Sequence, residues 1–219
     1  LNVLQKGIGK QDQYMAAFGG LTVLEIAQDG KVVVKNVQLR ESAVATLINH
    51  THLYFTGLAR DTVQVLSHQN LAMKTQGRDR ERVQDSLLGI KQIGYQILEA
   101  IEKEEFDLWG RLLHDHWERM KRMCDQISRT AIDELYDEVR DRFGVLGGKI
   151  IGAGGGGFLA LYYPRNDGRL EDFMMQRDMP RLYYYVEREG SKVVANVSST
   201  QSMILHPTRA APSGEYRLP

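Results

Sequence analysis

The segment from Gly148 to Tyr163 constrains the fold more than any other part of this chain. Five of the six residues at 152–157 are glycine, and short apolar runs with strand character precede and follow them. Each glycine adds to the conformational entropy that folding must remove, so a run of glycines is costly. Such a loop is expected where side chains would prevent another group from approaching the backbone. The approaching group is either a phosphate or another backbone segment that reaches the peptide N–H groups. Phosphate chemistry is therefore the first hypothesis for the function.

A dinucleotide-binding loop is the main alternative, because Gly152, Gly154 and Gly157 match the spacing G-x-G-x-x-G. That fingerprint requires a helix directly after the glycines. Here the run at 158–163 is apolar and aromatic and ends at Pro164, which predicts a strand instead. The pattern therefore argues against a nicotinamide or flavin site.

Composition argues against several classes of partner. The chain has 28 basic and 28 acidic side chains, so it carries no basic field for nucleic acid or for an acidic membrane surface. Eight glycines and Lys149 interrupt residues 144–163, which argues against a membrane span. The single cysteine, Cys124, fits a reducing compartment, and we expect a cytoplasmic protein. The chain begins at Leu1, inside a motif, and reads as the later part of a longer protein.

Hydrophobic periodicity predicts an α+β fold, in which helices pack on one side of an antiparallel sheet. We expect residues 46–197 to form a sheet of about four strands, with residues 152–157 in an exposed loop between two of them. Gly19-Gly20 is typical of a helix end, and Gln28-Asp29-Gly30 of a hairpin turn. The predicted helices are 11–18, 56–73, 83–102, 108–123, 130–144 (starting with a capping box at Thr130 and Asp133) and 168–177, with a polar break at 76–82; the predicted strands are 21–26, 31–37, 52–55, 158–163 and a hairpin of 181–186 with 192–196.

The second chemical feature is the segment from Gly7 to Tyr14. Two glycines allow a tight turn, and a polar quartet then follows at a helix N-terminus. Asp12 lies in the first turn, where the helix dipole and the charge of Lys10 favour the ionised carboxylate. Such a carboxylate suits accepting a proton or a hydrogen bond from a substrate hydroxyl. The alternative is that Asp12 only stabilises the helix start.

Three segments in this order resemble the GHMP small-molecule kinases, over roughly residues 2–197: Gly9–Gly20, Phe55–Arg60 and Leu146–Phe158. The most similar branch is the sugar kinases that act on heptose 7-phosphate, with fucokinases and galactokinases as relatives. The resemblance implies phosphoryl transfer from ATP, with Mg²⁺, to a hydroxyl of a sugar or sugar phosphate, the anomeric one. It also implies a ferredoxin-like C-terminal domain.

The resemblance and the residue types together give candidate roles to single residues. Asp12 inherits the role of catalytic carboxylate. Thr56 and Arg60 are a candidate anion site at a helix start, with an N-cap and a surface ion pair as the alternative. His50 and His52 share a strand face, but no third ligand has suitable spacing, so we expect no metal site. The expected substrate-binding residues are Lys10, Gln11, Gln13, Thr56 and Arg60, and the expected phosphate-side loop is Gly152, Gly154, Gly155, Gly156 and Gly157.

One motif of the family is not found. Relatives carry a phosphate loop of the type Pro-x-x-x-Gly-Leu-Gly-Ser-Ser upstream of the Asp segment, and this chain has none. We therefore expect residues 1–45 to be the end of an incomplete first domain, residues 46–197 a complete second domain and residues 198–219 an irregular tail. The unpaired edge at 21–37 would allow a homodimer. The alternative function is a non-catalytic sugar- or nucleotide-binding protein, or a regulatory remnant, on the same scaffold.

Overall fold

The computed structural model describes residues 10–58, 77–123, 127–152 and 154–194. Among these residues, the chain divides into two compact units. The larger unit comprises residues 39–185, and the smaller one comprises residues 10–38 and 186–194. The domain boundaries at 45 and 197 stay predictions, as does the helix at 56–73, which lies mostly outside the described residues.

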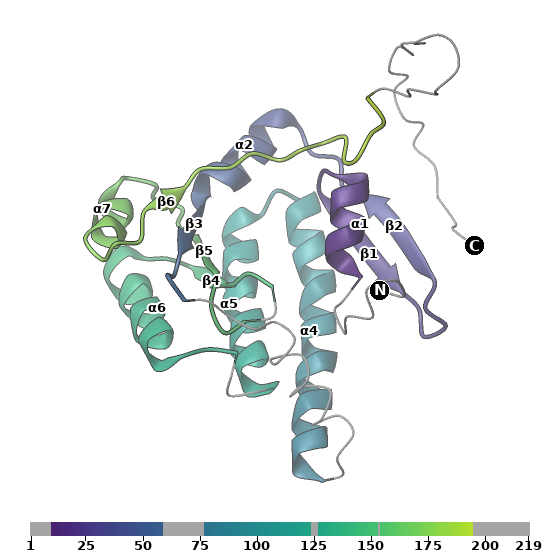
Figure 1. Ribbon diagram of the computed structural model, residues 1–219, viewed down its shortest axis with the longest axis horizontal. Helices are drawn as coiled ribbons and strands as arrows, with labels where there is room; N and C mark the ends of the chain where they lie inside the picture. Colours follow the sequence, from purple (N-terminus) through teal and green to yellow (C-terminus); the bar gives the residue numbers. More distant parts are fainter. Residues whose placement is uncertain (1–9, 59–76, 124–126, 153, 195–219) are drawn as a thin grey trace, which may run out of the picture. The chain divides into compact units, whose positions relative to one another are not determined.

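The smaller unit is a short helix followed by a hairpin (Figure 1). Helix α1 (Gln11–Phe18) ends at Gly19, whose φ of 65° is a backbone conformation that glycine adopts at little cost. Strands β1 (Thr22–Ile26) and β2 (Val32–Asn36) pair antiparallel across the turn that contains Gly30. The helix end and the hairpin predicted from the sequence are both confirmed.

The larger unit is built on a four-stranded sheet in the order β4-β5-β3-β6. Each pair is antiparallel, as the alternating pattern predicts, and no helix opens after the glycine loop. The α+β prediction is therefore confirmed, and the dinucleotide reading is excluded. The strands are β3 (Thr51–Phe55), β4 (Gly147–Ile150), β5 (Phe158–Tyr162) and β6 (Arg181–Leu182).

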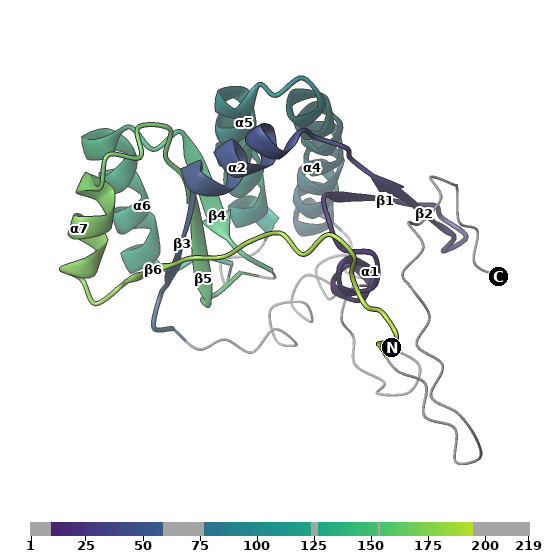
Figure 2. The same ribbon diagram turned by 90° about the horizontal axis from the view of Figure 1, so that it is seen from above.

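Helices flank both sides of this sheet, which corrects the expected one-sided arrangement. Successive residues of β5 point to opposite faces, so Leu161 and Tyr162 face different layers. Helices α6 (Thr130–Phe143) and α7 (Arg169–Met175) lie on one side, and α5 (Phe106–Met123) lies on the other, next to α4 (Arg78–Glu102) (Figure 2). The largest fully buried side chains include Trp117, Tyr54, Tyr136, Tyr163, Leu159, Leu161, Leu170 and Met174.

Three local predictions were wrong. Helix α2 (Glu41–His50) was missed, although its buried Ala43, Val44 and Leu47 have helical spacing. Helix α4 begins at Arg78, so the predicted polar break is shorter than expected. The N-cap of α6 is Arg129, without a side-chain cap, so Thr130 starts no capping box.

The hairpin predicted at 181–196 does not form in its described part. Strand β6 covers two residues, pairs with β3, and is followed by no strand through residue 194. The two halves of the predicted hairpin belong to different units, which separate between 185 and 186. Tyr185, Val193 and Val194 are therefore exposed, because alternation alone supplies no partner edge.

Buried His52 on β3 predicts an acid-sensitive fold. Its Nε2 donates to Asn166 Oδ1 and its Nδ1 accepts from the Tyr54 hydroxyl, both at 2.9 Å. Burial, with a smaller contribution from the charge of Arg181, lowers the pKa of His52 from 6.5 to about 4. The neutral ring therefore stabilises the fold fully above pH 6.5, and this contribution is lost as the pH falls to about 4.

We expect acid to cost about 2 to 3 kcal/mol of unfolding free energy through this residue. Urea unfolding at neutral pH and near the lower pKa measures it in the native protein and in His52→Gln. The variant should lose less stability on acidification than the native chain. An equal loss in both would show that other groups carry the acid sensitivity.

Candidate active site

The glycine loop at 152–157 connects β4 to β5 as a hairpin. The Ile151 N–H donates to the Phe158 carbonyl at 2.8 Å and closes it. Gly152, Gly154, Gly155, Gly156 and Gly157 all have φ between 78° and 147°. Those are conformations that other residues rarely adopt, so glycine is required by the backbone path itself.

Other backbone segments approach this loop closely. The Gly155 N–H donates to the Ile127 carbonyl at 2.7 Å, and the Gly157 N–H donates to the Leu58 carbonyl at 3.0 Å. A Cβ at Gly154 would lie 2.7 Å from the Ile127 oxygen, and one at Gly156 would lie 2.6 Å from the Leu58 oxygen. Of the two explanations for the glycines, backbone approach is therefore observed directly.

This packing also corrects the expected exposure of the loop. Residues 154–156 are buried, and only Gly152 is exposed among the described glycines of the loop. A phosphate role for the loop stays a prediction. If the N–H groups of Gly155 and Gly157 bound a phosphate, they would have to give up their hydrogen bonds to the Ile127 and Leu58 carbonyls.

Thr56 is hydrogen-bonded to the glycine loop. Its N–H and its hydroxyl both donate to the Gly157 carbonyl at 2.8 Å. The structure thus brings two predicted site residues, Thr56 and Gly157, into direct contact. The substrate-binding role of Thr56 stays a prediction, and Arg60 lies outside the described residues.

The predicted catalytic carboxylate lies on α1 in the smaller unit. Asp12 is in the first turn and is exposed, next to Gln11 and Gln13. Within the described residues its side chain forms no hydrogen bond or ion pair, and the N-cap Lys10 provides no side-chain cap. In this part of the chain no contact occupies the carboxylate, which leaves it available to a substrate hydroxyl. The roles of all four residues stay predictions.

Lys149 has an environment that the sequence analysis did not predict. It lies on β4 and is partly buried, and this burial lowers the pKa of its ammonium from 10.5 to about 8. His116 on α5 has a buried Nδ1 with no hydrogen-bond partner. The signal in the sequence was a lysine among the apolar residues that precede the glycines.

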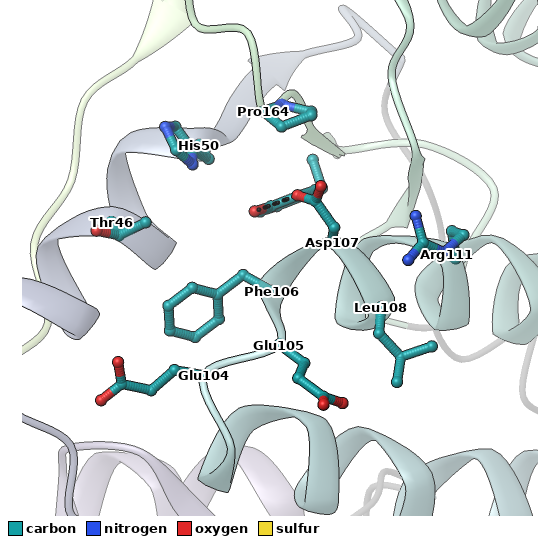
Figure 3. Close-up of a pocket in the computed structure, with 10 residues that line it drawn as sticks. Thr46, His50, Glu104, Glu105, Phe106, Asp107, Leu108, Arg111 and Pro164 are labelled. Atoms are coloured by element: carbon teal, nitrogen blue, oxygen red, sulfur yellow. Dashed lines mark hydrogen bonds between the residues drawn. The ribbon is translucent and has the colours of Figure 1, made fainter.

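The larger unit also contains a cavity of about 750 Å³ between α2, the start of α5 and the end of β5 (Figure 3). The Tyr162 hydroxyl donates to Asp107 at 3.3 Å, and His50, Thr46 and Arg111 also line the cavity. The cavity adjoins the last residues of β5, about 13 Å along the strand from the end that meets the glycine loop. It contains no residue that sequence analysis had assigned to a site.

The described residues contain neither a metal-binding cluster nor a membrane-spanning helix. No three His, Cys, Asp or Glu side chains lie together in a way that could hold a metal ion. None of the helices in this part of the chain is long and apolar enough to cross a membrane.

Comparison with known proteins agrees with the motif assignment. Residues 97–177 match the family described as GHMP kinases C terminal. Over 154 residues the chain is 27% identical to D-glycero-alpha-D-manno-heptose 7-phosphate kinase of Campylobacter jejuni. The matched region covers 70% of this chain and 44% of that protein. The chain thus spans less than half the length of this curated relative.

Solved structures show the same fold. A D-glycero-D-manno-heptose 1-phosphate kinase from Bacteroides thetaiotaomicron superimposes with a TM-score of 0.56 at 22% identity, over 86% of this chain and 49% of that one. The L. major mevalonate kinase, in complex with R-mevalonate, has a TM-score of 0.61 at 19% identity, over 81% and 53% of the two chains. The predicted resemblance to GHMP kinases is therefore confirmed.

Proposed function

Since residues 97–177 match the C-terminal domain of GHMP kinases, we propose that this chain supplies the C-terminal part of an ATP-dependent sugar kinase. That match is the observation that carries the proposal. The acceptor we propose is a heptose 7-phosphate or a related sugar phosphate, as the name of the Campylobacter jejuni relative suggests. The reacting group is the anomeric hydroxyl, and the enzyme works in the cytoplasm.

In the proposed reaction, the sugar oxygen attacks the γ-phosphorus of ATP while its proton passes to Asp12. The bond from phosphorus to the ADP oxygen breaks, and ADP leaves. Asp12 is suited to this role because it is exposed and has no partner in the described structure. Lys10, Gln11, Gln13, Thr56 and Arg60 would hold the sugar.

ATP is the second substrate, and Mg²⁺ bound with it would neutralise part of the charge of its phosphates. The glycine loop would line the side of the active site that holds the phosphates of ATP, where the absence of side chains leaves room for them.

The test is an assay of the protein isolated from the cells that make it. ADP release and ³¹P NMR are measured with ATP, Mg²⁺, D-glycero-D-manno-heptose 7-phosphate and a panel of free sugars. Phosphorylation at the anomeric carbon supports the proposal. Binding of a sugar or nucleotide without any turnover would refute it and favour the regulatory remnant.

The 219-residue chain produced alone is expected to turn over much more slowly than about 1 per second. Its sequence holds no helix-opening phosphate loop for the β- and γ-phosphates of ATP, and positioning supplies much of the rate in this chemistry. The same ADP-release assay measures it. A turnover of about 1 per second or faster would mean that other residues of this chain hold the nucleotide.

A further inference from the structure

Lys149 is a partly buried cation, and none of the described residues supplies a counter-charge to it. Burial is the only cause that lowers its pKa, and no acidic group offsets it. Within the described structure its ammonium forms no hydrogen bond or ion pair. A charge removed from water without a partner is costly, so an unpaired lysine in such a place indicates a missing anion.

Strand β4 packs on α5, and Lys149 lies at the level of His116, close enough for its charge to act on that ring. A Cβ at Gly147 would lie 2.0 Å from the Gly110 carbonyl oxygen and 2.7 Å from the His114 nitrogen, so β4 crosses α5 there. Lys149 is two residues on and points to the same face as Gly147. That step of about 7 Å corresponds to about four or five residues of helix, which reaches the level of His116.

His116 offers a second unsatisfied group. Its Nδ1 is buried and has no partner, and unpaired buried polar atoms are rare in folded proteins. Burial, followed by the charge of Lys149, lowers the pKa of this imidazole to about 4. The ring is therefore neutral near pH 7 and can still donate one N–H to an anion.

The acidic residues of the neighbouring turns do not supply the missing charge. Glu118 forms an ion pair with Lys121 at 2.7 Å. Asp133 also forms an ion pair with Lys121 and accepts a hydrogen bond from the Ser128 hydroxyl. Asp115 is exposed and contributes nothing to the pKa of Lys149 or His116. Among the residues that the structure describes, the pair thus presents one positive charge and N–H donors without a competing carboxylate.

We propose that Lys149 and His116 form a binding subsite for a phosphate group. A phosphate monoester carries between one and two negative charges near pH 7 and accepts several hydrogen bonds, which matches both groups. Strand β4 runs from Lys149 directly into the glycine loop, so the subsite adjoins the predicted phosphate side. This inference rests on the proposed kinase function for its biological meaning, and the phosphate can come from a sugar phosphate or from a nucleotide.

Thermal unfolding of the 219-residue chain tests the subsite without any turnover. Inorganic phosphate, mannose 6-phosphate, mannose and ADP are added separately at equal ionic strength. At about ten times its Kd, phosphate should raise the Tm of the native chain by about 3 to 5 °C. Lys149→Met should abolish this shift, and Lys149→Arg, which keeps the charge, should retain most of it.

Two controls separate binding from damage. Lys91→Met removes one exposed lysine from α4 and should keep the full shift. Without phosphate, Lys149→Met should unfold at the same temperature as the native chain or higher, because it removes an unpaired charge. Should Lys149→Met fail to fold, His116→Gln serves instead, and it should lose most of the shift.

The ligand arms identify the source of the phosphate. A shift with mannose 6-phosphate that exceeds those with mannose and ADP assigns the subsite to a sugar phosphate, and a larger shift with ADP assigns it to the nucleotide. Equal phosphate shifts in the native chain and in Lys149→Met, or no shift in the native chain, overturn the subsite. A Lys149-dependent shift in a protein without kinase activity would keep the subsite and refute only the proposed function.

Discussion

Replacing Asp12 by Asn is expected to lower the turnover of an active kinase that contains this chain by about 10²-fold or more. The amide keeps the shape of the side chain but cannot accept the proton of the attacking hydroxyl. Binding of the sugar should survive, because the variant keeps the hydrogen-bonding capacity of the site. Single-turnover rates and the sugar Kd measure the two effects separately.

Asp79→Asn is the matched control for this prediction. Asp79 also lies in the first turn of a helix and is exposed, so the substitution removes the same charge from the same helical position. Its effect on turnover should be negligible. If Asp12→Asn changes the single-turnover rate by less than a few fold, as the control does, Asp12 is only a helix-start residue.

Gly147→Ala is expected to destabilise the larger unit by about 3 kcal/mol. The added methyl would lie 2.0 Å from the Gly110 carbonyl oxygen and 2.7 Å from the His114 backbone nitrogen. Both neighbours are backbone atoms of α5, so β4 and the helix must separate, since no side chain can rotate away. Urea unfolding measures the loss, through the midpoint and the m-value.

Gly94→Ala is the control for the glycine prediction. A Cβ at Gly94 would meet nothing within 4 Å, and the residue lies inside α4. Alanine is the better helix former, so this variant should gain up to about 1 kcal/mol. A Gly147→Ala protein as stable as the native chain would mean that β4 and α5 do not pack this closely in solution.

Local patterns predicted most of the elements. The helix at 11–18, the hairpin after it and the strands on both sides of the glycine loop follow from periodicity and from turn residues. These signals depend only on residues close together in the sequence, so a single sequence is enough to detect them. Helix α2 had such a signal in Ala43, Val44 and Leu47, although it was not predicted.

Local sequence patterns predicted only part of the candidate site. The residue types around Asp12 and the glycines are enough to suggest phosphate chemistry. Two contacts join segments far apart in the chain. The Thr56 hydroxyl donates to the Gly157 carbonyl, and the charge of Lys149 acts on the His116 ring. No local pattern encodes which carbonyl or ring will meet them.

Two features of this protein follow from its amino-acid order alone: a glycine-dense loop that joins two antiparallel strands, and the combination of helices and strands in an α+β fold. They are predictable because backbone propensities and the period of apolar residues act over a few residues. Two others required the folded chain. The glycines admit the Ile127 and Leu58 carbonyls, and the apolar pattern forms no hairpin over its described residues, 181–194. Those outcomes depend on which distant segments pack together, and packing is settled by the register of the sheet and the close fit of its helices.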